Sequence, residues 1–195
     1  IRMARFAFFP AKSSGFAIAA AMMAGGTLGA TAIATPAYAQ KQAKFSKEFL
    51  AAFQPIDEAI KGENPDYAAL RAQAEAAKDT VKTDDERFFY GSTMYTIGGK
   101  LNDVPLQLEG MNMMLDSGKV PEANVPQYTY VAGQLAFNSQ DWASARARFE
   151  KAIELGYEVE QARALIARTY SEEGDFTAAL QTVNDQINEQ IAAGG

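Results

Sequence analysis

Two stretches of this chain repeat each other at a fixed offset of 34 residues. Residues 141–145 (Asp-Trp-Ala-Ser-Ala) return as residues 175–179 (Asp-Phe-Thr-Ala-Ala), and Gly133 corresponds to Ala167 in the same register. A recurrence of this length indicates a supersecondary unit that cannot bury its apolar face alone and stacks on its neighbours instead. The offset therefore predicts a repeat architecture rather than a domain folded around one closed core.

The chain begins with a segment that is typical of export. Its first twelve residues carry three cations and no acid, residues 13–39 carry no charge, and an Ala-x-Ala site ends at Ala39. This order predicts a secretory signal peptide over 1–39, cleaved after Ala39. The alternative is an uncleaved membrane anchor, since the charge-free stretch is long enough to span a bilayer. We favour cleavage, which leaves a domain over 40–195 in the periplasm or secreted, without stable membrane insertion.

Charge and composition exclude several classes of function. Removing the three cations of the leader leaves 15 Lys and Arg against 24 Asp and Glu, a net charge of −9 that opposes nucleic-acid binding. Cysteine and histidine are both absent. Disulfides, zinc sites of the usual Cys/His type and Ser-His-Asp or Cys-His centres therefore cannot form. We expect no cofactor, no metal and no enzymatic activity.

Apolar spacing and helix-capping residues predict an all-α domain with no sheet. Ser46 and Asp66 are candidate N-caps, and Thr83 with Glu86 forms a capping box. We expect Gly98 and Gly99 to end the helix that follows the capping box. The predicted helices form four antiparallel hairpins and span residues 45–60, 66–81, 83–98, 103–118, 126–138, 141–155, 158–172 and 175–191.

The last two hairpins resemble the tetratricopeptide repeat family. Ile166-Ala167-x-x-Tyr170 is similar to the Leu-Gly-x-x-Tyr element of that family's first helix, and Ala179-x-x-x-Val183 is similar to the Ala-x-x-x-Phe element of its second. The preceding hairpin places similar residues at Ala132, Gly133, Ala145, Phe149 and Ala152. The resemblance covers residues 126–156 and 158–191. It implies an α-solenoid of about four hairpins in a right-handed superhelical stack.

The chain also departs from the family pattern. Thr129 and Arg163 stand at the tryptophan position, and Gln186 replaces a small residue of the final helix. We interpret Gln186 as part of a solvent-facing terminal cap. We also expect Phe149, Tyr170 and either Trp142 or Phe176 to fill the space between helices. The alternative to the repeat interpretation is a generic helical bundle with two accidental matches.

The resemblance implies a protein that binds other proteins in a concave groove lined by the first helix of each hairpin. It places Phe89, Ser92, Thr96, Tyr130, Gln134, Phe137, Ala164 and Arg168 along that groove. Aromatic anchors beside polar groups suit peptide recognition, so we predict a partner-binding set of Phe89, Tyr130, Gln134, Phe137 and Arg168. The groove positions do not reproduce the family's clamp for a partner's C-terminus. We expect Phe88 and Tyr128 to belong to the core.

Other interpretations of the sequence remain open. A structural role through self-association into a homo-oligomer is the first alternative. A carbohydrate-binding or carbohydrate-cleaving protein is the second, and it would use paired carboxylates such as Asp84 with Asp85 or Glu158 with Glu160. Helix-start and loop charge explains these pairs more simply, because neighbouring helical residues point in different directions. Core packing is the simpler account of Met111, Met113 and Met114, and exposed ion pairs with Glu150, Glu154 and Glu172 are the simpler account of Arg146, Arg148, Arg163 and Arg168.

Overall fold

Eight α-helices make up most of the chain that the computed structural model describes, residues 44–192 and 194. They are α1 (Lys47–Ile60), α2 (Tyr67–Ala76), α3 (Asp84–Leu101), α4 (Val104–Asp116), α5 (Val125–Asn138), α6 (Trp142–Glu154), α7 (Val159–Glu173) and α8 (Phe176–Ala192). No strand occurs within these residues, so the all-α prediction is confirmed for them. The predicted signal peptide over 1–39 lies outside the described part of the chain. None of the described helices is both long and apolar enough to cross a bilayer.

The helices begin where the capping residues predict. The Ser46 hydroxyl accepts a hydrogen bond from the Phe49 amide at 3.2 Å, which caps α1. At the start of α3, the Thr83 hydroxyl accepts from the Glu86 amide while the Glu86 carboxylate accepts from the Thr83 amide at 2.8 Å. This reciprocal capping box satisfies two amides that would otherwise lack a partner at the end of the helix.

One turn geometry recurs in the last three hairpins, α3–α4, α5–α6 and α7–α8. A residue with positive φ ends the first helix, and the next residue is an aspartate whose amide donates back to that helix at 2.9 Å. The aspartate carboxylate then accepts from the amide three residues on, at 2.9–3.1 Å. The three turns are Asn102-Asp103, Gln140-Asp141 and Gly174-Asp175. The hairpin over 84–116 therefore shares a feature of the two later hairpins, although its sequence matches them only loosely.

Two predicted helix ends are wrong. Helix α3 continues through Gly98 and Gly99 and ends at Leu101. The next residue, Asn102, adopts a left-handed conformation with φ 55°. Gly98 allows α4 to pack closely against α3, because a Cβ at this position would lie 2.8 Å from the Gln107 amide nitrogen of α4. Helix α2 ends at Ala76 and not near Val81. The Ala77 amide also bonds the carbonyl three residues back, and the chain then continues as a 3₁₀ segment, Lys78–Thr80.

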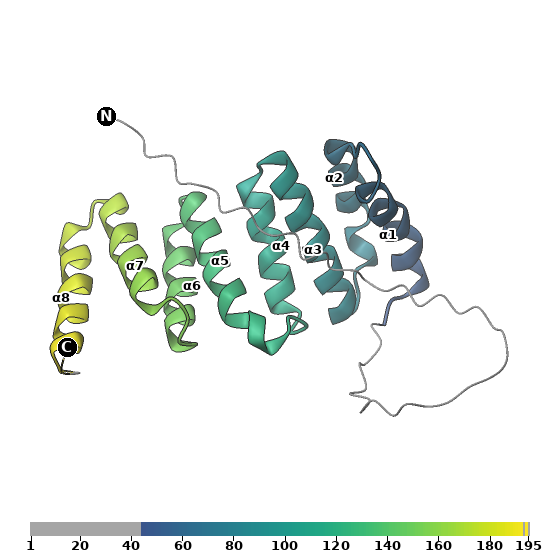
Figure 1. The fold of residues 1–195 in the computed structure, drawn as a ribbon. Helices are drawn as coiled ribbons and strands as arrows, with labels where there is room; N and C mark the ends of the chain where they lie inside the picture. The colour runs from purple at the N-terminus through teal and green to yellow at the C-terminus, as the bar shows by residue number, and fades with distance from the viewer. Residues whose placement is uncertain (1–43, 193, 195) are drawn as a thin grey trace, which may run out of the picture. The chain divides into compact units, whose positions relative to one another are not determined.

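The helices pack against their neighbours in chain order, from α1 to α8 (Figure 1). Helices α3 and α4 approach each other at two glycines, because a Cβ on Gly91 would lie 2.6 Å from the Gly110 carbonyl oxygen. In α5–α6, a Cβ on Gly133 would lie 2.7 Å from the Phe149 ring, so a glycine is needed where that buried ring crosses α5. Small residues thus set the distance between these paired helices.

The final helix departs from the predicted packing. Phe176 does not fill the space between helices, because its side chain is 66 % exposed. Gln186 does not face solvent as a terminal cap; it is half-buried and its side chain donates to Glu160 of α7. Only Ala179 of α8 is buried. The helix therefore turns small and polar side chains toward α7 and its large apolar side chains toward water.

Candidate functional site

Three of the predicted binding residues form one face of α5. Tyr130, Gln134 and Phe137 are spaced by four and three residues, which places them on the same side of a helix. The two aromatic rings are half-buried and the Gln134 side chain is exposed. Aromatic surface and an exposed side-chain amide therefore lie next to each other on this face.

An arginine from α7 covers one end of this face. The Arg168 guanidinium lies 5.0 Å from the centre of the Phe137 ring, within the range of a cation–π contact. Trp142 packs edge-on against the same ring at 5.1 Å. The Nε of Arg168 also donates to Glu172 at 3.3 Å, which holds the side chain along α7. The contact joins the first helices of two successive hairpins.

The other end of the face is aromatic as well. The Tyr130 ring lies 5.6 Å from Phe149 and 5.7 Å from Tyr157, which precedes α7. Burial and the nearby Glu158 carboxylate raise the pKa of the Tyr130 hydroxyl, while a hydrogen bond with the Gln134 side chain opposes them. The hydroxyl therefore stays protonated near neutral pH and is available as a hydrogen-bond donor or acceptor.

The structure leaves Phe89 apart from the other four predicted residues. Its ring packs against α1, 5.7 Å from Phe45, 5.7 Å from Phe49 and 6.3 Å from Phe53. These contacts place Phe89 beside the core cluster of the first helices and not beside Tyr130. Ser92 and Thr96 are half-buried and Ala164 is exposed. Phe88 and Tyr128 pack against the second core cluster, as the sequence predicts.

Most of the arginines pair differently from the sequence prediction. Only Arg168 contacts a predicted acid, Glu172. Arg146 pairs with Glu173, and Arg163 pairs with Glu189. Each reaches an acid on the next helix rather than on its own, because consecutive helices pack side by side. Arg148 donates instead to Asn112 of α4 at 2.7 Å.

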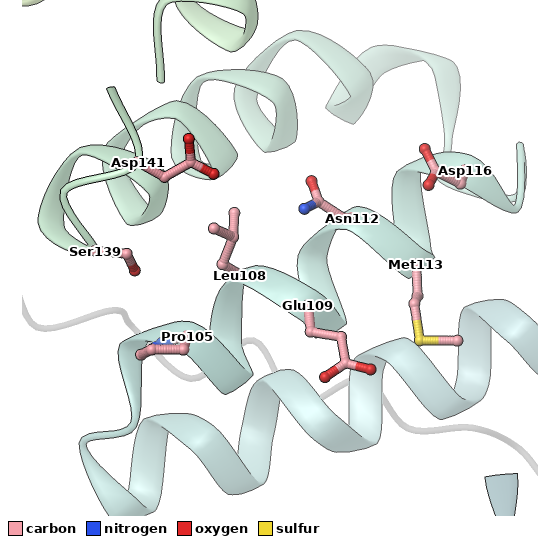
Figure 2. Close-up of a pocket in the computed structure, with 8 residues that line it drawn as sticks. All are labelled: Pro105, Leu108, Glu109, Asn112, Met113, Asp116, Ser139 and Asp141. Atoms are coloured by element: carbon pink, nitrogen blue, oxygen red, sulfur yellow. The ribbon is translucent and has the colours of Figure 1, made fainter. Parts of the chain in front are cut away.

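A hollow lies on α4, beside the turn between α5 and α6. It has a volume of about 550 Å³, and Figure 2 shows Leu108 and Asn112 projecting from α4 toward Ser139 and Asp141. Its full lining is Pro105, Leu108, Glu109, Asn112, Met113, Asp116, Ser139 and Asp141. The size suits a small ligand, and the lining includes three carboxylates, from Glu109, Asp116 and Asp141.

The carboxylates of this hollow already have structural partners. Glu109 pairs with Lys78 at 2.9 Å, Asp116 lies 4.0 Å from Arg148, and Asp141 caps α6. Among the described residues, no group of three or more acids is arranged to hold a metal ion. We therefore place the candidate site on the α5–α7 face.

The paired carboxylates considered for carbohydrate chemistry also serve the fold. Asp84 pairs with Arg87, and Asp85 accepts from the Lys44 amide at 3.0 Å. That hydrogen bond lowers the pKa of the Asp85 carboxyl below its usual value, and Lys119 adds to the effect. Met111 and Met114 are buried in the core, in agreement with the packing interpretation.

Comparison with known proteins does not add to this description. The chain matches no protein-family model, no curated protein and no solved structure. The residues themselves therefore carry the functional argument. Tyr157 and Trp142 were not predicted as site residues, although each ring packs against the ring of a predicted binding residue. The 34-residue register could have indicated Tyr157, which falls where the repeat pattern closes with proline.

Proposed function

We propose that this chain is a non-catalytic scaffold that holds a segment of another protein on the α5–α7 face. In this proposal the four hairpins form an α-solenoid that is similar to tetratricopeptide repeats. The shared turn at Asp103, Asp141 and Asp175 supports the repeat, because an identical backbone device is used at three corresponding places. The leader supports export, so the partner would be a protein of the bacterial cell envelope or a secreted protein.

The contact between Arg168 and Phe137 carries this proposal. It fixes α7 beside α5, so that Tyr130, Gln134, Phe137 and Arg168 form one surface from two hairpins. Tyr130 and Phe137 stand two turns apart, about 10 Å along the helix. An extended peptide covers that distance with about three residues, so two of its side chains could contact the two rings. The Gln134 amide between the rings is placed to hydrogen-bond the peptide backbone.

We expect Gln134→Ala/Arg168→Ala to weaken capture of the partner at least about tenfold, which corresponds to about 1.4 kcal/mol of binding energy. Both side chains are exposed, so the double variant should keep its helicity and melting temperature. The measurement is affinity capture of proteins from a bacterial envelope extract by the purified chain, quantified by mass spectrometry against the unsubstituted chain.

The matched control is Lys151→Ala/Glu154→Ala, which removes an exposed ion pair from α6. It deletes the same number of side chains without touching α5 or α7, and it should capture the same protein at the same level. Equal loss in both variants, or full capture by the Gln134/Arg168 variant, would place binding elsewhere and contradict the proposal.

A further inference from the structure

Helix α8 exposes a continuous apolar stripe. Seven large apolar side chains are exposed in the described residues, and five of them lie on this one helix. They are Phe176 (66 %), Leu180 (65 %), Val183 (41 %), Ile187 (47 %) and Ile191 (67 %). The separations of four, three, four and four residues keep all five on one side of the helix. Scattered surface apolar residues need no explanation, but a stripe along a whole helix marks an interaction surface.

If this stripe only stabilised the fold, we would expect it to face α7 and the polar side of α8 to face water. The side that faces α7 carries small and polar residues. Ala179 is buried there, Gln186 and Gln190 donate to Glu160, and Glu189 pairs with Arg163. The polar contacts anchor α8 in an orientation that leaves its apolar side available.

The charge around the stripe does not oppose pairing with a second copy of this acidic chain. Helix α8 has no Lys or Arg, and its two acids lie away from the stripe. At about 3.6 residues per turn, Asp185 falls on the side opposite Val183 and Ile187, and Glu189 is turned to α7. The flanking residues, Thr177, Asn184 and Gln190, are neutral. A second copy, although it is acidic overall, therefore meets no like charge along this stripe.

The dimensions of the stripe also fit a symmetric pair. At these exposed fractions the five side chains leave about 500 Å² of apolar surface in water. Two copies would bury about 1,000 Å², which is the lower limit for a specific interface. The four-three-four spacing from Phe176 to Ile187 is the spacing by which two helices interlock along a seam. A two-fold contact needs such a self-complementary surface.

We propose that α8 pairs with α8 of a second copy, so that the chain is a homodimer joined at this helix. A membrane surface fits less well, because interfacial helices carry Lys or Arg beside the apolar face and α8 has neither. The pairing uses none of the residues of the α5–α7 face. A dimer would present two such faces, which raises the avidity for a partner with repeated segments.

We expect the purified full-length chain to sediment as a dimer at micromolar concentration, and Leu180→Asp/Ile187→Asp to sediment as a monomer at every concentration up to about 100 µM. Two buried carboxylates at the centre of the seam would face their counterparts without neutralising partners. Gln181→Asp is the control, since it adds a carboxylate to α8 on the side away from the stripe and should leave the dimer intact. A monomeric unsubstituted chain, or a dimer that persists in the double variant, would overturn the proposal.

The absence of cysteine permits a second, independent test. Val183→Cys, at the middle of the stripe, should form a disulfide-linked dimer on mild oxidation, whereas Gln181→Cys should not. Equal cross-linking at both positions would overturn the pairing, and so would exclusive linkage of Val183→Cys to a different protein in extract. The Gln134→Ala/Arg168→Ala variant should dimerise normally, so loss of partner capture and loss of the dimer are distinguishable.

Discussion

Replacing Gly91 or Gly110 by alanine should lower the free energy of unfolding by about 2–4 kcal/mol. That is a large part of the roughly 5–15 kcal/mol by which a typical domain is stable. A Cβ on Gly110 would lie 2.5 Å from the Gly91 carbonyl oxygen and 2.5 Å from the Tyr95 amide nitrogen. Backbone atoms cannot rotate away as a side chain can, so α3 and α4 would have to separate. Their separation would open the core around Tyr90 and Met111.

The measurement is urea and thermal unfolding followed by helical circular dichroism. Gly99→Ala is the matched control, because it lies on the same helix, is exposed, and would place its Cβ 3.8 Å from only the end of the Gln107 side chain. Alanine favours a helix interior over glycine by about 1 kcal/mol, so this variant should be neutral or slightly stabilised. Similar unfolding of Gly91→Ala and Gly99→Ala would show that α3 and α4 do not touch as described.

Glu86→Gln should lower the free energy of unfolding by about 3 kcal/mol. Glu86 is fully buried, and its carboxylate accepts from the Ser46 amide at 2.6 Å, from Lys82 at 2.7 Å and from Thr83 at 2.8 Å. Glutamine offers one acceptor oxygen, so its NH₂ group would face at least one buried amide donor. The Ser46 bond joins the start of α1 to α3, and its loss should therefore loosen the first helix most.

The same carboxylate predicts how stability depends on pH. Burial alone raises the pKa of Glu86, but the three amide donors outweigh burial and hold the pKa at about 2, below the ordinary 4.5. The unfolded chain binds this proton first, so the contribution of Glu86 is complete above pH 4.5 and is lost as the pH falls toward 2. Between pH 4.5 and pH 2, the Glu86→Gln variant should therefore lose less of its free energy of unfolding than the unsubstituted chain.

Asp84→Asn is the control for this prediction. It neutralises an acid at the same helix terminus, but the Asp84 side chain is 57 % exposed and contacts only Arg87. We expect a change in the free energy of unfolding of no more than about 0.5 kcal/mol and an unchanged pH profile. Parallel pH profiles for Glu86→Gln and the unsubstituted chain would contradict the role assigned to Glu86.

Local chemistry made the helix starts predictable. A cap needs only a side-chain oxygen a few residues from an amide, so Ser46, Asp66 and Thr83 could be identified from sequence. Helix ends were harder to predict, because a glycine can either end a helix or let another helix pack closely against it. Gly98 and Gly99 resemble a stop signal, but Gly98 is present because another helix passes close to it.

The candidate site was predictable only where the repeat register applied. Tyr130, Gln134 and Phe137 follow from spacing within one helix, and Arg168 follows from the 34-residue offset that relates Gln134 to it. Phe89 could not be assigned, because α1 lies on it and α1 has no clear repeat pattern. The orientation of α8 was missed for a related reason: polar contacts with Glu160 and Arg163 decide it, and these depend on tertiary packing.

Site-directed photo-cross-linking at Gln134 tests the central claim most directly. A photoreactive residue at position 134 would lie between the Tyr130 and Phe137 rings. The control is the same photoreactive residue at position 154, an exposed position on α6. Our account predicts that ultraviolet irradiation in cells links position 134 to one envelope or secreted protein and that position 154 yields no such product. The same product from both positions, or from position 154 alone, would contradict a binding face on α5 and α7.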